Sequence, residues 1–484
     1  MKPLFPINHR GLLLVAFLSL FAHGVVHGFV HPGILVNGAQ LDFVKGKIAI
    51  NQEPWTAAFD NVKASKYGKA TYTPTPVAVV GCGEGGSGID EGCTEEMSDA
   101  IAAYTQALLW YFTGQNAYAL KSIQIMNAWS KVFKDHKFDM TKYTNGHLQA
   151  AWVAEEFTRA AEIIRYTKAG WLDADVERFS TMLDSAFLPH VIHGWTGGGG
   201  NWQLSMAEAT INIGVFTDNQ TTFAAGLALW RAQVPSMIYL ESDGNKPIFP
   251  PPGTVVTDID KYWYQQKVYV DGLDHETCRD FSHTAMGFAG AINGAETARI
   301  QGVDLYKEEA RRITTSLEFH ARYLNGAKMP DWLCNGVLDL GGEGYKLTWE
   351  IGYNHYSGRM GMALPETKAL ISKIRPAAAA LHMAWEALTH ANTGNVIFLP
   401  VVDINFQPKT ILARNLVCRV SVQINCPEKC RFEIVDLRGH NIFGGVAHKA
   451  ENVLIPSELL SEGVYYLRFT ASGRNEIARI LMVR

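Results

Sequence analysis

Apolar residues recur at intervals of three and four over most of the chain, and this periodicity constrains its fold more than any other feature. Between about Glu95 and about Thr393, segments such as SDAIAAYTQALLWYFTGQNAYALKSIQIMNAWSKV and NGHLQAAWVAEEFTRAAEIIRYT place an apolar stripe along one helix face. Gly and Asn separate these segments, as in FTGQN and WTGGGGN, where helices end and the chain turns. Successive helix pairs of similar length predict a mainly α ring of helical hairpins.

Two long segments lack this periodicity. ESDGNKPIFPPPGTVVTDIDKYWYQQKVYVDG spans residues 241–272, and NGVLDLGGEGYKLTWEIGYNHYSGRMGMALPET spans residues 335–367. Long irregular stretches in a helical scaffold usually shape a site, so we expect both to border the functional region.

The pattern changes after HANTGN. RVSVQI, RFEIVDL and GVYYLRF carry β-branched and aromatic residues between turns, which predicts a small β-sandwich over residues 399–484. FEIVDLRGHNIF, GVYYLRF and the short basic end resemble the C-terminal sorting domain of type IX secretion in Gram-negative bacteria. That resemblance implies contact with the secretion machinery; a plain β module beside a carbohydrate-active domain is the alternative.

The first 28 residues are typical of a signal peptide. Lys2 and Arg10 precede an apolar run from Leu12 to about Val26, followed by small residues, and an uncleaved N-terminal anchor is the alternative. No later run approaches the roughly 20 apolar residues of a spanning helix. We therefore predict a secreted, cell-surface or periplasmic protein of a Gram-negative bacterium.

The charge balance excludes one class of partner. Removing residues 1–28 leaves 41 basic against 47 acidic residues, a net charge of −6. Nucleic acid is therefore not expected as a partner. An acidic substrate remains possible because cations gathered in a cleft can oppose the sign of the whole chain.

Seven cysteines in an exported chain favour disulfides. Cys82 and Cys93 bracket GEGGSGIDEG, a loop that gains stability when closed, so we predict that they pair. Cys418, Cys426 and Cys430 lie together, and CPEKC lacks a second Cys/His pair at zinc spacing. A disulfide is favoured there and no metal site is predicted.

The segment DHETCRDFSH gathers three polar groups. If Asp274 caps a helix, Glu276, Arg279 and His283 fall at i, i+3 and i+7 and share one face. The alternative is a solvated face with a simple Glu–Arg pair.

Two further clusters carry suitable chemistry. GWTGGGGNWQLS places four glycines before Asn201 and Trp202, where backbone can approach a ligand closely. EIGYNHYSGR gathers five polar or aromatic residues within ten positions, namely Glu350, Tyr353, His355, Tyr356 and Arg359. Structural roles are the alternative, since Asn201 can cap a helix and either tyrosine can pack with its hydroxyl bonded.

Several separated motifs in order carry a resemblance that spans most of residues 30–395. YTQALLWYFTGQNAYALKSIQIMNAWS, GNWQLSMAEATINIGVFTDN, ETCRDFSHTAMGF and EIGYNHYSGRMGMALPET are similar to the alginate-lyase-like proteins, closest to polysaccharide lyase family 38. The resemblance implies an (α/α) toroid of six or seven helical hairpins over residues 29–398. It also implies β-elimination on an anionic uronic acid polymer, alginate (polymannuronate) or glucuronan, without a redox cofactor.

The reaction assigns roles to the matched residues. Removing the proton beside a uronate carboxylate builds negative charge that donors must absorb, and Asn201 or a protonated Glu276 can do so. Arg279 can instead bind the carboxylate bidentately. His283 is the expected base, and Tyr356 the expected acid toward the leaving oxygen, with Tyr353 its competitor. His283→Ala and Tyr356→Phe are each expected to lose turnover.

The remaining candidates are expected to hold the substrate. His355 supports the tyrosine, and Arg359 and Glu350 lie in the same motif. Among the tryptophans, only Trp202 and Trp195 are expected to stack on sugar rings.

Two other functions compete with a lyase. A toroid glycoside hydrolase would use carboxylates such as Glu276 and Glu350 as acid and base. A non-catalytic surface glycan-binding protein would need only the tryptophans. The clustered His, Tyr, Arg, Asn and Glu exceed what binding requires, which favours the lyase.

Overall fold

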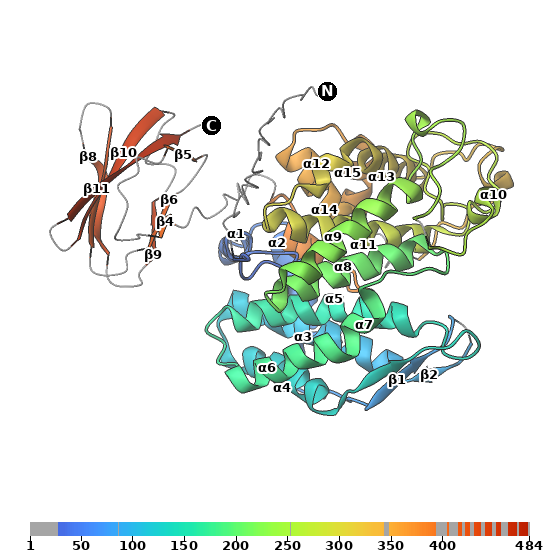
Figure 1. The fold of residues 1–484 in the computed structure, drawn as a ribbon, viewed down its shortest axis with the longest axis horizontal. Helices are drawn as coiled ribbons and strands as arrows, with labels where there is room; N and C mark the ends of the chain where they lie inside the picture. The colour runs from blue at the N-terminus through green and yellow to red at the C-terminus, as the bar shows by residue number, and fades with distance from the viewer. Residues whose placement is uncertain are drawn as a thin grey trace, which may run out of the picture.

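The computed structural model describes residues 28–85, 87–251, 253–342 and 348–393, together with strands between residues 404 and 482 (Figure 1). Sixteen α-helices lie in the first part: α1 (Gly38–Ala49), α2 (Trp55–Ala64), α3 (Cys93–Thr113), α4 (Asn116–Val132), α5 (Gly146–Arg165), α6 (Asp173–Met182), α7 (Leu188–Val191), α8 (Gly200–Phe216), α9 (Gln220–Met237), α10 (Ile259–Tyr262), α11 (Phe281–Ile300), α12 (Leu305–Glu308), α13 (Ala310–Leu324), α14 (Trp349–Tyr353), α15 (Pro365–Ile374) and α16 (Glu386–His390). Two π-helical turns, η2 (Leu183–Phe187) and η6 (Asn354–Arg359), continue α6 and α14.

The inner helices α3, α5, α8 and α11 run parallel to one another. Along α8 and α11, Gly287 faces Asn201, Gly290 faces Leu204, and the Thr297 hydroxyl donates to Asn212, so the contacts advance in the same direction on both helices. A Cβ on Gly290 would lie 2.5 Å from the carbonyl carbon of Leu204, so the close approach of these two helices requires glycine there.

Contacts between the other inner helices show that these helices are parallel as well. Gln149 of α5 donates to Glu96 of α3, and near the other end the Trp110 indole donates to Thr167. Trp152 of α5 donates to Ser205 of α8. The N-terminal ends of these helices therefore lie at one end of the ring.

Outer helices return the chain between inner ones. Gly114 ends α3 with a φ of 68° and its N–H donates to the Trp110 carbonyl, after which α4 runs back along α3. Helix α9 packs in the same way on α8, and α15 contacts both α13 and α14. Helix α16 closes the ring, because it packs against α1, α2 and α14 and the Trp385 indole donates to Thr105 of α3.

The fold is therefore the mainly α toroid predicted from the helical periodicity. One local prediction is wrong: the segment 335–367 is not irregular throughout, because residues 349–359 form α14 and η6 and α15 begins at Pro365. In the segment 241–272, the described residues form no long helix; a 3₁₀ turn (Glu241–Asp243) and the short α10 lie there.

A three-stranded sheet, with β1 (Val79–Cys82) between β2 (Asp90–Glu91) and β3 (Asp135–Lys137), lies beside the N-terminal ends of α3 and α5. The predicted disulfide joins Cys82 and Cys93 and closes the loop between β1 and α3. A second disulfide, Cys278–Cys334, was not predicted.

The C-terminal strands form two sheets. The five-stranded sheet has the order β5 (Asn415–Cys418), β11 (Arg474–Met482), β10 (Gly463–Ala471), β7 (Cys430–Val435) and β8 (Asn441–Ala447). The three-stranded sheet has the order β4 (Ile404–Asn405), β6 (Val422–Asn425) and β9 (Asn452–Ile455). The predicted boundary at residue 399 and the signal peptide, except for its last residue, lie outside the described residues and stay predictions. Among the described helices, none combines the length and apolarity that crossing a membrane requires.

Candidate active site

The candidate site is built at the N-terminal ends of α8 and α11. Asn201 is the second residue of α8, and residues 275–279 form turns immediately before α11. A Cβ on Gly200 would lie 2.6 Å from the His275 imidazole. The last glycine of WTGGGGN therefore allows α8 to start directly against the turn that carries Glu276.

Asn201 and Glu276 form the buried centre of the site. The Asn201 Nδ2 lies 2.7 Å from both carboxyl oxygens of Glu276, and the Asn201 backbone N–H donates to Oε2 at 3.2 Å. Both side chains are fully buried. Burial raises the pKa of Glu276, and the hydrogen bond from Asn201 and the charge of Arg279 oppose the rise.

Arg279 connects this centre to solvent. Its Nη1 donates to Glu276 Oε1 at 3.3 Å, and a third of the side chain is exposed. Tyr264, from the irregular segment 241–272, lies close enough to Glu276 and Arg279 to interact with their charges. Its side chain is 39% exposed. Burial raises the pKa of Tyr264 to about 12, Glu276 adds to this rise, and Arg279 opposes it.

The backbone at Tyr264 is strained. Tyr264 and Gln265 have φ values of 51° and 63°, in the left-handed region that costs residues with a side chain about 1–2 kcal/mol each. Strain of this kind clusters at functional sites, where surrounding contacts hold it. Sequence reasoning missed Tyr264; its only signal was its place in an aromatic irregular stretch.

His283 is oriented by Asp280, which is the true N-cap of α11. Asp280 Oδ1 accepts from the His283 backbone N–H at 2.9 Å, and Oδ2 lies 2.6 Å from His283 Nδ1. With Nδ1 engaged, Nε2 is the nitrogen left to meet a ligand, and 29% of the imidazole side chain is exposed. Asp280 was also missed, although an Asp three residues before His283 is a recognisable cap signal.

The predicted helix start is therefore wrong, although the predicted triplet is assembled. Asp274 does not cap a helix; it forms a β-bridge with Ile238, and its Oδ1 accepts from the Glu276 N–H. Glu276 precedes α11 rather than sharing a helix face with His283. The turn nevertheless brings Glu276 close enough for His283 and Arg279 to act on its pKa.

Tyr356 does not belong to this site. It is fully buried in the core, its hydroxyl donates to the Tyr306 carbonyl at 3.0 Å, and burial raises its pKa well above the usual range. A hydroxyl held by backbone without access to a polymer cannot protonate a leaving group, so its predicted role as acid is wrong. Tyr353 is half-buried beside Arg375.

Two of the partners predicted with Tyr356 lie near the other end of α11. Arg359 donates to both oxygens of Glu296 at 2.9 and 3.0 Å, and His355 stacks on Tyr306 with centroids 3.8 Å apart. Glu296 follows His283 by 13 residues of α11, which is about 20 Å along a helix. Glu350 is paired with Arg375, whose Nε donates at 2.6 Å. Arg359 and His355 are therefore not placed to bind a substrate at Asn201, whereas Glu350 stays a prediction: the neighbouring Trp349 packs on Phe288, near the Asn201 end of α11.

Two tryptophans form an aromatic wall. Trp195 and Trp202 are half-buried, with ring centroids 4.6 Å apart, and Trp195 also packs on Phe138 and His147. Trp202 follows Asn201 directly, so the pair lies beside the polar centre. Such rings suit the apolar faces of sugars.

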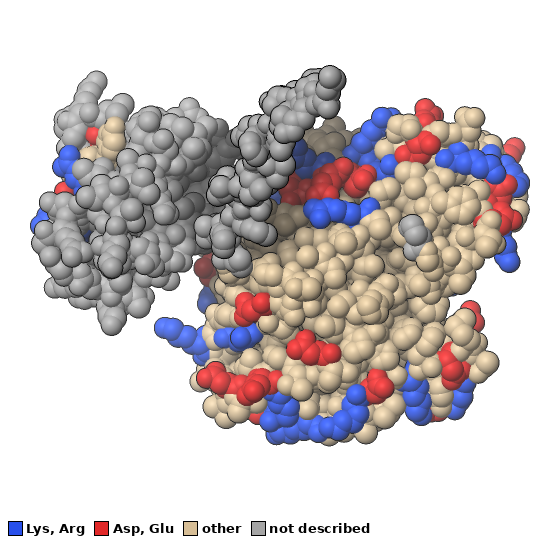
Figure 2. Space-filling view, in the orientation of Figure 1, with Lys and Arg blue, Asp and Glu red and all other residues tan. Residues whose placement is uncertain are grey.

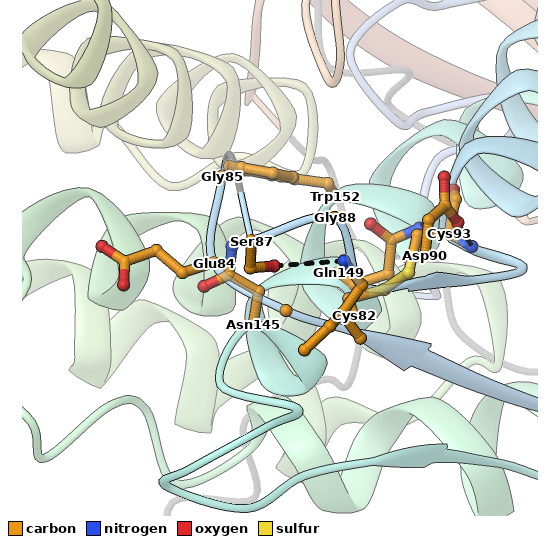
Figure 3. Close-up of a pocket in the computed structure, with 12 residues that line it drawn as sticks. Cys82, Glu84, Gly85, Ser87, Gly88, Asp90, Cys93, Asn145, Gln149 and Trp152 are labelled. Atoms are coloured by element: carbon orange, nitrogen blue, oxygen red, sulfur yellow. Dashed lines mark hydrogen bonds between the residues drawn. A yellow bond between two sulfur atoms is a disulfide. The ribbon is translucent and has the colours of Figure 1, made fainter.

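A cavity of about 280 Å³ lies at the same end of the toroid, lined by residues 82–85 and 87–90 and by Cys93, Asn145, Gln149 and Trp152 (Figure 3). Figure 3 shows Trp152 across the cavity from the Cys82–Cys93 disulfide. The Trp152 indole bonds Ser205, one helical turn beyond Asn201. The cavity and the polar centre thus adjoin the same face of α8.

Charge on the visible surface is mixed. Figure 2 shows basic and acidic side chains interspersed along the lower edge and the upper right, around a largely uncharged middle. Within the site, Arg279 supplies a positive charge beside Glu276.

A sequence model of alginate lyases matches residues 83–329, just over half of the chain. The chain belongs to the alginate lyase family. This lyase also shares its fold with solved structures. Alginate lyase A1-III from Sphingomonas species A1 matches with a TM-score of 0.52 and 18% identity over 75% of this chain and 97% of that one. A variant of A1-III complexed with a tetrasaccharide matches with a TM-score of 0.51 and 17% identity over 76% and 96% of the two chains.

No curated protein matches the chain. The family assigns the enzyme class, so this protein is a polysaccharide lyase. The matched range contains Asn201, Glu276, Arg279 and His283 and ends before Tyr353 and Tyr356.

Proposed function

We propose that this lyase cleaves a uronate polymer, alginate (polymannuronate) or glucuronan, by β-elimination and leaves 4,5-unsaturated uronate ends. The observation that carries the proposal is the contact of Asn201 with a buried Glu276 beside Arg279 and the Asp280–His283 pair. The A1-III variant solved with a tetrasaccharide supports an oligosaccharide ligand for this fold. The motifs quoted above favour polysaccharide lyase family 38.

Arg279 neutralises the substrate carboxylate, and Asn201 supports it through Glu276. Arg279 is one-third exposed and offers the fixed positive charge. Asn201 is fully buried and its amide bonds both oxygens of Glu276, so it holds that carboxyl beside Arg279 and acts as a positioning residue. The raised pKa of Glu276 favours its protonated form, which spares the site a second negative charge as the dianion develops.

His283 takes the proton from C5. Asp280 holds Nδ1, so the Nε2 lone pair is aimed outward, and the imidazolium formed is stabilised by the Asp280 carboxylate. Asp280 acts through His283 and is a positioning residue.

Tyr264 protonates the leaving oxygen. The C5–H electron pair forms the C4–C5 double bond, the C4–O bond breaks, and the glycosidic oxygen takes the Tyr264 proton. With its pKa raised to about 12, Tyr264 carries that proton at neutral pH. Arg279 stabilises the resulting phenolate, and proton return from the medium completes the cycle.

The deciding assay mixes the purified protein with alginate, polymannuronate, glucuronan and glycosaminoglycans and follows ultraviolet absorbance and reducing ends in parallel. We expect absorbance to rise on a uronate polymer. New reducing ends without absorbance would identify a hydrolase instead, and binding without either product would identify a glycan-binding protein.

Export is proposed on the N-terminal and C-terminal sequence. A charged start, an apolar run and small residues at 24 and 28 support a signal peptide, and the strands beyond residue 404 are compatible with a sorting domain. N-terminal sequencing of protein from the medium or the cell surface tests this. Chains that begin near Phe29 are expected, and an intact Met1 would contradict cleavage.

A further inference from the structure

A second polar cluster lies inside the toroid, apart from the candidate active site. Glu155 and Arg159 come from α5, Glu208 comes from α8, and His382 comes from the segment between α15 and α16. All four side chains are fully buried. The cluster therefore connects two inner helices to the part of the chain that closes the ring.

Direct contacts satisfy only part of this cluster. His382 Nδ1 lies 2.6 Å from Glu155 Oε2, and Arg159 donates to Glu208 Oε1 and, at 2.8 Å, to the His382 carbonyl. Arg159 also pairs with Glu156. One arginine thus serves two carboxylates, and a third carboxylate faces a histidine.

Three ligand-type atoms in the cluster have no hydrogen-bond partner in the described part of the chain: Glu155 Oε1, Glu208 Oε2 and His382 Nε2. Buried polar atoms without partners are rare, because each costs about 1–3 kcal/mol, more when charged. Three in one cluster point to a missing electrophilic partner.

The charge balance points the same way. Glu155, Glu156 and Glu208 oppose the single fixed charge of Arg159, and burying unpaired carboxylates is strongly unfavourable. The fully buried Glu386 is coupled to Arg159 and Glu156 as well, so a divalent cation would offset two of four carboxylates beside the one arginine and leave a single negative charge for a proton.

We propose that Glu155, Glu208 and His382 bind a divalent transition-metal ion, with zinc the best fit. One ligand atom from each residue lies within 4.8 Å of the others. Two carboxylates and one imidazole are a donor set that zinc accepts, with water as a fourth ligand. Zinc bonds of about 2.0–2.2 Å place ligand atoms roughly 3.3 Å apart, so small side-chain rotations complete the site.

The ion would act as a structural cross-link. It joins α5, α8 and the closing segment near His382, and the Trp152 ring, which lines the cavity in Figure 3, packs on the His382 ring with centroids 5.6 Å apart. Losing the ion would loosen one wall of the cavity without removing Asn201, Arg279 or His283.

Elemental analysis of the tag-free full-length protein, purified without added metal, tests the proposal. We expect about one zinc or similar ion per chain. His382→Gln and Glu208→Gln should each lower bound metal at least tenfold. His320→Gln is the matched control, because His320 is equally buried but bonds Thr277 and Ser316, and it should keep the metal.

A melting experiment keeps the test decisive if a variant fails to fold. A chelator should lower the Tm of the wild type, and one equivalent of zinc should restore it. The proposal would be overturned if the wild type held no stoichiometric metal and if neither the chelator nor zinc changed its Tm. Equal metal in wild type and in a folded His382→Gln or Glu208→Gln variant would overturn it too.

Discussion

Replacing Tyr264 by phenylalanine removes the hydroxyl assigned to the leaving oxygen while keeping the ring. A positioned general acid contributes about 10²–10⁴-fold to the rate, so turnover should fall by that factor, equal to about 3–5 kcal/mol in the activation free energy. Stability should change little, because Tyr264 is 39% exposed and its ring remains. Initial rates of ultraviolet absorbance on the preferred polymer measure the effect.

Tyr356→Phe is the matched control and reverses the expectation drawn from the sequence. It removes the 3.0 Å hydrogen bond to the buried Tyr306 carbonyl and should cost about 1–3 kcal/mol of folding free energy. Its Tm should fall by a few degrees while turnover stays near that of the wild type. A fully active Tyr264→Phe enzyme, or a folded Tyr356→Phe enzyme without turnover, would refute the assignment.

Three further changes probe the site. His283→Ala should lower turnover at least about 100-fold with the fold retained, and Asp280→Asn should lower turnover because the imidazole loses its orientation. Circular dichroism checks the fold and initial rates check the turnover of both variants. Full activity in His283→Ala would show that His283 is not the base. Folding raises the pKa of Glu276, so the folded state favours the protonated carboxyl. The wild type should therefore lose stability relative to Glu276→Gln as the pH rises above the usual carboxyl pKa of 4.5. Melting temperatures measured across pH check this, and parallel pH dependences of the two proteins would contradict it. Cys278→Ser should lower the free energy of unfolding by about 4 kcal/mol, because the Cys278–Cys334 bridge spans 56 residues. Cys93→Ser should lower it by about 3 kcal/mol, because its bridge spans 11 residues. Denaturant unfolding measures both, and an unchanged free energy of unfolding would contradict the chain-entropy argument.

Local patterns predicted much of the scaffold. The α3–α4 hairpin follows from periodicity ended by Gly114, and the Cys82–Cys93 bridge follows from a short loop between its cysteines. Both depend on residues near one another in sequence. Cys278 and Cys334 lie 56 residues apart in irregular segments, and no local pattern connects them.

The tyrosine assignment failed for a geometric reason. In EIGYNHYSGR the chain passes from α14 into the π-helical turn η6, which changes the rotation per residue, so sequence spacing does not tell which ring faces inward. Tyr264 lay in a segment without any period. Its position depends on two consecutive left-handed residues that no sequence rule for tyrosine or glutamine predicts.

The parallel inner helices supply local positive potential on a chain whose net charge is −4. Helix N-termini carry partial positive charge, and the cavity-lining Cys93 and Gln149, together with Asn201 and His283, all lie in the first turns of α3, α5, α8 and α11. Arg279 adds a full charge at the same end. About 20 Å away along α11, Glu296 pairs with Arg359 and Arg299, so those cations do not compete for the polymer. The direction of the helices thus favours this end of the toroid as the proposed substrate site.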